Sequence, residues 1–443
     1  MGKAVRAKCP RALHAEWKPP RERPDPVKLI TESDRGRIAE LVPIRHGRML
    51  ESPFTFYRGA ALNMAFDLAS MPSTGIWVQC CGDAHLVNFR GFGTPERRVQ
   101  FDIHDLDETL PAPWEWDVKR LAVSLVLASR ENGFGDASGA DAARECARSY
   151  REHMIEYGKM TVLDVWYSSL DANVLAPSIQ DSGTRRRVMR RLAKERERSA
   201  LEDDFAELAH RPRGGGAVIR DNPPTIFHPR DKSARTAFYA GLPETFAQYR
   251  TSLPSPVRTL LDRFQFKDMA FKVVGVGSVG TLCLVVLLMA DDTDPLFLQV
   301  KEARASVLEA YAGKSIFRHH GQRVVHGHWL MQSASDIFLG WCTGTTGRHF
   351  YVRQLRDMKL KPTVSAFNLT DMIQFGEYCG WTLARAHARS GKPAMIGGYL
   401  GTNETFDKAI AAFSIAYADQ TERDYELLKK AAQRGKLKVA MER

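Results

Sequence analysis

The sequence predicts an α+β fold in which a β-rich block lies late in the chain, between helical regions. Residues 269–302 are rich in valine and leucine and are broken by turn residues, a pattern typical of strands. Residues 54–71 and 366–390 instead place apolar residues at helical spacing. The 443 residues contain no run of about 20 apolar residues, so a membrane-spanning helix is not expected.

The remaining elements follow from the same patterns, taken in chain order. Pro72 and Gly75 end the first helix. Short strands are expected at Ile76–Cys81 and Val99–Leu106, with a loop at Gly82–Phe92 between them. Further helices are expected at 116–160, across most of 160–265, at 303–313 and at 403–435, and further strands at 337–356.

These elements divide the chain into four expected segments. They are a basic N-terminal arm (1–45), a helical lobe that carries two polar loops (46–265), a β-rich lobe (266–365) and C-terminal helices that complete the helical lobe (366–443).

The composition is that of a globular protein with a basic surface. The 63 basic and 52 acidic residues give a net charge of +11, which permits an anionic partner without identifying it. Much of the excess lies in the N-terminal arm and in Arg185–Arg198, where a solvated helix face is the simplest interpretation. The seven cysteines form no CxxC pair, which argues against a zinc ribbon or a disulfide framework. The reducing cytoplasm is therefore the expected compartment.

The first polar cluster is the loop Gly82–Asn88, with the sequence GDAHLVN. A compact loop can direct Asp83 and Asn88 into one cleft. A carboxylate in that position can accept a proton from an attacking hydroxyl, and an amide oxygen is a hard ligand suited to Mg²⁺. The same spacing also occurs in Asx-rich turns that have no catalytic role.

The second cluster is the segment Phe101–Glu108. Its four carboxylates belong to Asp102, Asp105, Asp107 and Glu108. Carboxylates this close together repel one another unless they are solvated or surround a divalent cation. Strand alternation places Asp105 on the face opposite to Asp102, at the end of the strand, where metal ligands are common. An exposed acidic turn is the alternative.

The third cluster is the GxGxxG pattern of Gly275, Gly277 and Gly280, which alone is a weak signal. The residues that follow, 281–288, are apolar and β-branched. We therefore expect the glycines at the tip of a β-hairpin and not at the start of a dinucleotide-binding helix. A tip without side chains can approach phosphate groups closely.

A third strand of this block ends in Lys301, after a turn at 291–295. A helix follows it, and Glu309 is the best candidate on that helix to form an ion pair with Lys301. The alternative for Lys301 is a strand-end lysine that extends its ammonium group to solvent.

Taken together, these residues resemble a protein-kinase-like phosphotransferase, most closely the aminoglycoside and choline phosphotransferase branch. That branch has a catalytic loop of the form HGDxHxxN, which Cys81–Asn88 resembles with cysteine in place of the first histidine. The branch then has a metal-binding aspartate after an apolar strand, to which Asp105 corresponds. Its next helix starts Asp-apolar-Ala-Arg-Leu, and Trp116–Leu121, WDVKRL, is similar.

The order of the two lobes differs from that branch. The glycine hairpin and Lys301 follow the catalytic loop, and the helix 376–390 resembles the helix that precedes this loop in the branch. We therefore expect a two-lobe protein-kinase-like fold with extra helices, circularly permuted by a cut between that helix and the loop. The motifs FYRGAA, GDAHLVNF, PWEWDVKRLA and LQVKEA also resemble a large uncharacterised bacterial family, domain-of-unknown-function family 2252.

The resemblance implies ATP- and Mg²⁺-dependent transfer of the γ-phosphoryl group to a hydroxyl acceptor that the sequence does not identify. Lys301 and Asp105 should then face one cleft within about 10 Å of each other. Arg58, in the FYRG turn, either orients an anionic group or is a structural surface arginine. The resemblance assigns Asp83 and His85 to catalysis, and Asn88, Asp105 and Asp107 to the metal, with Asp107 either an auxiliary ligand or a residue that orders the loop. It assigns the nucleotide to Gly275, Gly277, Ser278, Gly280, Lys301 and Glu309.

Two other classes stay open. A nucleotide-binding pseudokinase is one, although the presence of Asp83, Asn88, Asp105 and Lys301 together argues against it. A basic nucleic-acid-binding protein that uses Arg185–Arg198 is the other, and it predicts steep salt dependence of binding. It is not favoured because that run lacks interleaved aromatic residues that would stack on bases.

Overall fold

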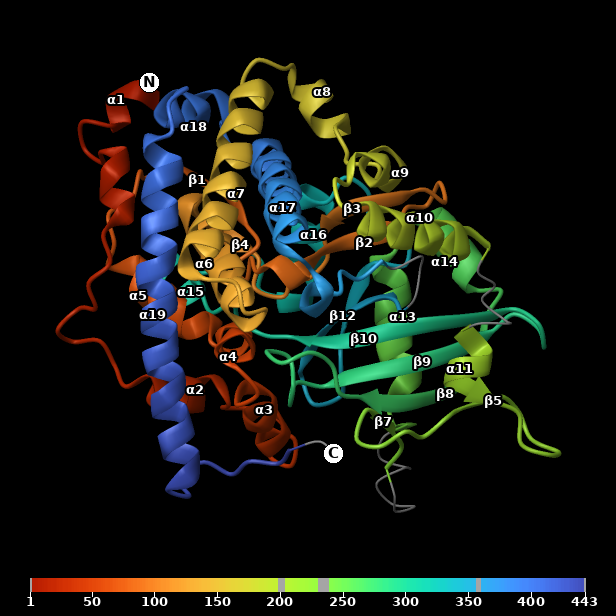
Figure 1. Ribbon diagram of the computed structural model, residues 1–443. Helices are drawn as coiled ribbons and strands as arrows, with labels where there is room; N and C mark the ends of the chain where they lie inside the picture. Colours follow the sequence, from red (N-terminus) through yellow and green to blue (C-terminus); the bar gives the residue numbers. More distant parts are fainter. Residues whose placement is uncertain (1, 198–203, 230–238, 356–359, 442–443) are drawn as a thin grey trace.

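The computed structural model describes residues 2–197, 204–229, 239–355 and 360–441. Long helices lie together on one side of the molecule and a six-stranded sheet lies on the other (Figure 1). The predicted α+β class is therefore confirmed. The helical side is built from four helices that pack on one another, α6 (Glu115–Glu131), α7 (Asp136–Tyr157), α17 (Leu369–Ser390) and α19 (Thr405–Gln433).

The helical part has the largest hydrophobic core of the molecule. Helix α6 is buried along nearly its whole length, from Glu115 to Ser129. At its start, the fully buried ring of Trp114 stacks on Tyr150 of α7 with ring centroids 5.4 Å apart. The expected helix at 116–160 is thus two helices, because Gly133 and Gly135 interrupt it.

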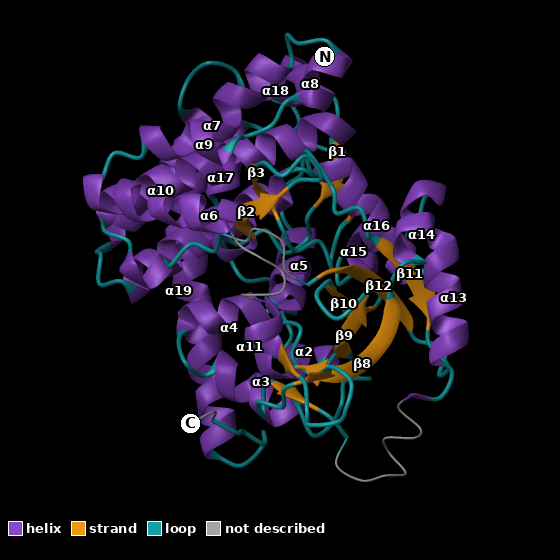
Figure 2. Ribbon diagram, turned by 90° about the vertical axis from the view of Figure 1, so that its right-hand side faces the viewer, coloured by secondary structure: helices purple, strands orange, loops and turns teal. Residues whose placement is uncertain are grey.

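The six-stranded sheet is antiparallel throughout and has the order β11-β12-β10-β9-β8-β7. The predicted hairpin around the glycines is confirmed, since β8 and β9 pair on either side of them. Figure 2 shows the sheet curving beside helices α13 and α14. The strands are β7 (Ile226–Phe227), β8 (Gln265–Lys272), β9 (Cys283–Met289), β10 (Pro295–Ala303), β11 (Gly340–Thr343) and β12 (His349–Gln354), and the two helices are α13 (Leu242–Ser252) and α14 (Ser255–Leu261).

Two small antiparallel pairs contact helix α17. Strand β1 (Trp77–Cys80) pairs with β4 (Leu110–Pro113), and β2 (Phe89–Gly93) pairs with β3 (Val99–Ile103). The expectation of a loop as far as Phe92 is therefore wrong, because residues 89–93 form a strand. The backbone of Leu360 extends this pair through two hydrogen bonds with Gly91.

The N-terminal segment packs along the helical part. Arg23 inserts between two buried carboxylates, those of Asp67 (2.8 Å) and Asp424 (2.5 Å). Its elements are α1 (Gly2–Val5), a 3₁₀ turn (Arg11–Ala15), α2 (Pro26–Ser33) and α3 (Val42–Met49), followed by α4 (Pro53–Gly59) and α5 (Ala61–Ala69).

The region between α7 and β8 is less helical than expected. It contains short helices and two-residue strands. After β10, the helix expected at 303–313 is only a single turn, α15 (Glu309–Ala312). None of the helices in the described part of the chain has the length and apolar character needed to cross a bilayer. The remaining elements are α8 (Val162–Tyr167), α9 (Ala172–Leu175), α10 (Ser182–Glu197), α11 (Ala206–Leu208), β5 (Ala209–His210), β6 (Val218–Ile219), α16 (His320–Met331) and α18 (Pro393–Leu400).

Candidate active site

The loop after β1 is held in shape by groups from two helices. Asp117, in the first turn of α6, accepts hydrogen bonds from the backbone N–H groups of Cys81 (2.5 Å) and Gly82 (3.0 Å). Nε2 of His387, on α17, lies 3.2 Å from the same carboxylate. Gly82 has a φ of +82°, and a Cβ there would lie 2.3 Å from a backbone carbonyl oxygen. Only glycine therefore fits at this turn.

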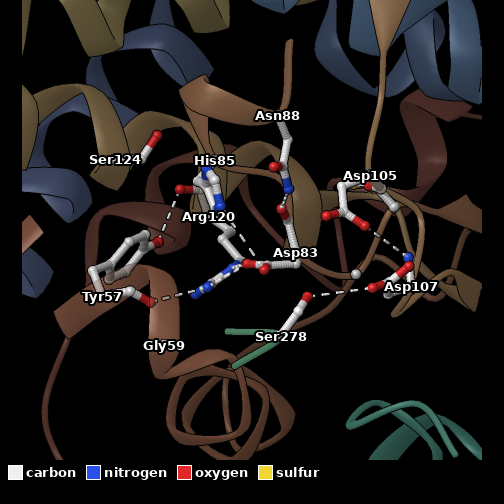
Figure 3. Close-up of polar contacts among 12 residues, drawn as sticks. Tyr57, Gly59, Asp83, His85, Asn88, Asp105, Asp107, Arg120, Ser124 and Ser278 are labelled. Atoms are coloured by element: carbon white, nitrogen blue, oxygen red, sulfur yellow. Dashed lines mark hydrogen bonds and ion pairs between the residues drawn. The ribbon is translucent and has the colours of Figure 1, made fainter. Parts of the chain in front are cut away.

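Asp83 projects from this loop and pairs with Arg120 of α6 (Figure 3). The guanidinium reaches Oδ1 with Nε (2.7 Å) and Nη2 (2.5 Å) and also donates to the carbonyl oxygen of Tyr57 (3.1 Å). Burial raises the pKa of Asp83, and Arg120 opposes that rise. In the described part of the chain Oδ2 has no hydrogen-bond donor. Arg120 thus holds Oδ1 of Asp83, whereas Oδ2 can still accept a hydrogen bond.

His85 lies beside Asp83 without bonding to its side chain. Its Nε2 atom is 3.9 Å from Oδ2 of Asp83, and its Nδ1 atom is buried with no partner among the described residues. Burial lowers the pKa of His85 well below its usual value, so the imidazole is neutral. This geometry suits a residue that shapes the loop better than the catalytic role expected for His85.

Asn88 ends a 3₁₀ turn, Leu86–Asn88, that brings its side chain back to the start of the loop. Its Nδ2 group donates to the backbone carbonyl oxygen of Asp83 at 2.8 Å. That bond directs Oδ1 away from Asp83, and this oxygen has no donor among the described residues. Ser124 of α6 secures the turn by accepting from the N–H of Leu86 at 3.0 Å.

Asp105 and Asp107 share the ammonium group of Lys301. Nζ lies 2.7 Å from Oδ2 of Asp107 and 3.6 Å from Oδ1 of Asp105. The expected separation of Lys301 and Asp105 is therefore met. Lys301 and Tyr351 are directly opposite on β10 and β12, so their side chains share one face of the sheet. The Tyr351 hydroxyl donates to Oδ1 of Asp107 at 2.5 Å, which leaves Asp107 bonded on both oxygens.

The surrounding charges shift the pKa values of Asp105 and Asp107 in opposite directions. Burial opposes the ionisation of Asp105, but the charges of Lys301 and Arg353 outweigh it and hold the pKa of Asp105 below its usual range. Burial and the charge of Asp105 raise the pKa of Asp107. Burial disfavours the charged form of Lys301, and the two aspartates nevertheless raise its pKa well above the usual value. An anionic Asp105 and a cationic Lys301 are the result.

The expected ion pair between Lys301 and Glu309 is not formed. Lys301 faces the turn that carries Asp105 and Asp107, whereas the chain has already left the sheet when it reaches Glu309 in α15. The carboxylate of Glu309 instead lies 3.5 Å from Nζ of Lys314. Sequence proximity suggested the wrong partner, because the sheet register directs Lys301 across the molecule.

The glycine-rich loop lies directly over this turn. Gly275 and Gly280 adopt positive φ values, +64° and +87°, which other residues rarely adopt. Oγ of Ser278 is 3.5 Å from Oδ2 of Asp107. The N-terminal segment holds the loop from above, since Arg37 donates to the carbonyl oxygen of Val279 at 2.6 Å.

One cavity of about 150 Å³ joins these features. Asp83, Asp105, Asp107, Gly277 and Ser278 line it together. Figure 3 shows the side chains of Asp83, Asp107 and Ser278 converging from separate segments of the chain. The other lining residues are Ser33, Arg37, Arg45, Arg58, Gly59, Ala61, Leu62, Glu108, Thr281, Glu302, Arg304, Ala305 and Val307.

The donor set fits Mg²⁺ at Asp105 and Asn88 but not at Asp107. Mg²⁺ takes oxygen ligands and commonly uses one or two protein groups, with water and phosphate completing the shell. Oδ2 of Asp105 and Oδ1 of Asn88 are oxygens without donors in the described part of the chain. Both oxygens of Asp107 are bonded, to Lys301 and Tyr351, and this favours the expected role of ordering the loop over that of an auxiliary metal ligand.

A second group of candidate metal ligands, Cys80, Asp117 and His387, is buried behind the loop. Its atoms already have partners within the chain. Asp117 accepts the two backbone N–H groups of the loop, and Nδ1 of His387 lies 2.9 Å from the hydroxyl of Tyr150. This group therefore stabilises the loop.

Three residues of the site escaped the sequence reasoning. Arg120 and Asp117 lie one turn apart in α6, in the WDVKRL motif, but nothing in that motif reveals which loop they contact. Tyr351 lies in a predicted strand, and only the register of the sheet shows that it faces Asp107. All three are recognised only by their contacts with residues far away in the sequence.

A comparison with known protein families identifies the family of this chain. It belongs to a family described as uncharacterised proteins conserved in bacteria, DUF2252, whose model matches residues 37–431. The match includes the loop of Asp83, the acidic turn and the glycine hairpin. No curated protein and no solved structure matches the chain.

Proposed function

We propose that this protein is an ATP- and Mg²⁺-dependent phosphotransferase that transfers the γ-phosphoryl group of ATP to a hydroxyl acceptor. The observation that carries the proposal is the convergence of Asp83, Asp105 and the glycine-rich hairpin on one cavity, with Lys301 3.6 Å from Asp105. Phosphoryl transfer needs these parts: a group that orients the hydroxyl, a metal ligand, a cation and a backbone loop for the phosphates.

Asp83 acts on the acceptor. It orients the hydroxyl and receives its proton as the bond from the hydroxyl oxygen to the γ-phosphorus forms. The bond from that phosphorus to the bridging oxygen of ADP breaks, and ADP leaves. Arg120 fixes Oδ1 of Asp83, so the unbonded Oδ2 performs the proton transfer.

The phosphates are positioned by groups on the opposite wall. Asn88 and Asp105 would hold Mg²⁺, which would neutralise charge on the phosphate oxygens. Lys301 contributes a buried positive charge whose position is fixed by Asp107 and the strand pairing. The loop from Gly275 to Gly280 brings backbone N–H groups to the phosphates without interference from large side chains.

The same proposal includes a circularly permuted, two-lobe kinase-like arrangement. In the kinase-like order, the helix that corresponds to α17 would lead directly into the catalytic loop. In this chain the end of α17 lies beside the start of that loop, although the two are far apart in sequence. Oγ of Ser390 accepts from the N–H of Gln79 at 2.9 Å, and His387 contacts Asp117, which anchors the loop.

The nucleic-acid alternative has less support. In α10, Arg185 donates to the carbonyl oxygen of Ile179 (2.8 Å) and Arg191 to that of Lys361 (3.4 Å), so part of the basic run contacts its own chain. Residues 198–203, where the run ends, lie outside the described residues.

Thermal unfolding of the full chain tests the proposal. Mg-ATP at 100 times its dissociation constant stabilises a protein by about 2.7 kcal/mol, and we expect a midpoint shift that requires Mg²⁺. Asp105→Asn should lose the shift. Asp292→Asn, the same chemical change at a fully exposed side chain, should keep it. No shift at millimolar Mg-ATP would refute the proposal. A shift without any ADP formation would favour a nucleotide-binding module that lacks catalysis.

A further inference from the structure

Four arginines line the cavity that holds Asp83, and three of them are engaged by the protein itself. Arg45 pairs with Asp34 at 2.5 Å and donates to the carbonyl oxygen of Gly59. Arg37 donates to the carbonyl oxygens of Ser33 and Val279, and Arg304 donates to that of Arg35. Arg58 is the exception among the described residues. It has no hydrogen-bond or ion-pair partner, and its Nε atom is buried.

The acidic residues of the same cavity do not supply the missing partner. Each of them already has a donor from its own chain, as follows: Arg120 for Asp83, Lys301 for Asp105 and Asp107, Arg348 for Glu302 and the N–H of Val307 for Glu108. A guanidinium without a partner in such a cavity binds an oxyanion well, because its planar array of donors matches carboxylate and phosphate.

Arg58 lines the same cavity as Asp83, and its backbone lies beside the glycine loop. It lies in the last turn of α4, next to Tyr57, whose carbonyl oxygen accepts from Arg120. A Cβ at Gly277 would lie 3.2 Å from the carbonyl oxygen of Arg58, so the glycine loop passes directly over this turn. The ring of Phe54 lies 5.9 Å from the guanidinium carbon and supports it. The charge of Asp83 favours the charged guanidinium, whereas burial lowers the pKa of Arg58.

We propose that Arg58 binds an anionic group of the acceptor, so that the acceptor is a small molecule with a phosphate or carboxylate group in addition to its hydroxyl. This inference rests on the proposed function, because it needs a nucleotide in the same cavity. The anion could have a second source, the γ-phosphate of ATP itself. The experiment therefore has one arm for each source.

Inorganic phosphate is the probe, titrated into the full chain and followed by thermal unfolding. In the first arm the protein is saturated with Mg-ADP, which leaves the γ-phosphate position open. In the second arm it is saturated with Mg²⁺ and a non-hydrolysable ATP analogue, which fills that position. We expect phosphate to stabilise the wild type in both arms. Arg58→Gln should bind phosphate about tenfold or more weakly, and Arg58→Lys should restore part of the loss.

Two controls separate this result from misfolding and from general charge effects. The midpoint shift caused by the Mg-nucleotide itself should be retained in Arg58→Gln, which shows that the variant is folded. Arg35→Gln removes a nearby exposed arginine that does not line the cavity and should leave phosphate binding unchanged.

Four outcomes overturn the inference. Phosphate that binds with Mg-ADP but not with the ATP analogue would assign Arg58 to the transferred phosphoryl group. Equal phosphate binding by Arg58→Gln and wild type would show that Arg58 does not bind the anion. A nucleotide shift with no phosphate effect would remove the anion site and leave the proposed function intact. Absence of any nucleotide shift in the wild type would instead mark the failure of the proposed function, and the inference would fail with it.

Discussion

Asp102 and Asp105 lie close together in one segment, yet the chain uses their oxygens very differently. Asp102, on β3, receives the guanidinium of Arg385 on Oδ1 at 2.5 Å. Its Oδ2 accepts from the backbone N–H and the hydroxyl of Ser333, at 2.7 and 2.8 Å. Asp105 keeps Oδ2 without a donor in the described residues, and its side chain is 30% exposed at the cavity.

The difference separates carboxylates whose oxygens are all bonded within the protein from carboxylates that keep an open oxygen at the cavity. A buried carboxylate with all its acceptor sites filled recovers the free energy lost on leaving water and fixes the elements around it. A carboxylate with an open oxygen at a cavity recovers only part of that free energy within the protein. Asp83 and Asp105 are of the second kind, and a metal or substrate can complete them.

The largest expected effect is on stability, from Asp102→Ala. Both side chains of the Asp102–Arg385 pair are completely buried, and removal of one partner of a buried pair costs about 3–5 kcal/mol. Asp105→Ala should cost less than about 1 kcal/mol, because its pair with Lys301 is longer and partly exposed. Urea unfolding at neutral pH measures both. Equal losses would show that the two aspartates do not differ in structural role.

The next effect is on the reaction, from Asp83→Asn. In the proposed mechanism Asp83 is the general base and other groups hold the phosphates. Loss of a general base lowers rates by about a hundredfold or more. We expect slower ADP formation and an unchanged dissociation constant for Mg-ATP. Asp292→Asn serves as the matched control. A parallel loss of affinity and rate would mean that Asp83 positions the nucleotide and not the hydroxyl.

Much of the fold and the centre of the site could be predicted from the sequence, because these features are encoded over a few residues. The glycines followed by β-branched residues predict a hairpin, and β8 and β9 form it. The strand that ends near Lys301 was predicted for the same reason. Strand β2 was missed because its sequence, FRGFG, contains two glycines and has little strand character of its own. It is a strand because β3 pairs with it.

Partner identity was the part that the sequence could not provide. Glu309 was chosen for Lys301 because a helix follows the strand, but the register that sets Lys301 opposite Tyr351 selects Asp107 instead. Arg120 was visible only as part of a helix start, and its contact with Asp83 depends on how α6 packs against the loop. Such pairings are properties of the packed chain.

Lys301 itself offers a sharper test of that pairing. A charge-assisted hydrogen bond is worth about 1.5–3 kcal/mol, so Lys301→Met should weaken Mg-ATP binding by roughly 10- to 100-fold. Lys314→Met, at a side chain that is 82% exposed, is the matched control. Glu309→Gln should also leave affinity unchanged, since Glu309 contacts Lys314. Calorimetric titration measures all three. A large loss of Mg-ATP affinity in Glu309→Gln would instead support the Lys301–Glu309 pair that the sequence predicted.

The smallest expected effect concerns Asp268, a carboxylate of β8 that resembles Asp102 because its own chain fills its oxygens. It accepts from the N–H of Ile219 (2.7 Å) and the hydroxyl of Tyr239 (2.8 Å), and Nε2 of His228 lies 3.1 Å away. The hydrogen bond to Asp268 raises the pKa of His228 above its usual value of 6.5. The protonated imidazole therefore adds stability that is fully present below pH 6.5 and is lost as the pH rises through the folded-state pKa.

His228→Asn should accordingly cost more stability at pH 5.5 than at pH 8.5. The neutral imidazole can still donate one hydrogen bond within this pair, so only the charge-assisted part is lost, and we expect a difference of about 1 kcal/mol or less between the two conditions. Urea unfolding of wild type and variant at both pH values measures it. Burial opposes the ionisation of Asp268, but its hydrogen-bond donors lower its pKa. A cost that grows with pH would mean that the neutral imidazole is the stabilising form. In that case only the backbone and tyrosine donors would lower the pKa of Asp268, and Asp268 would not form an ion pair like that of Asp102 with Arg385.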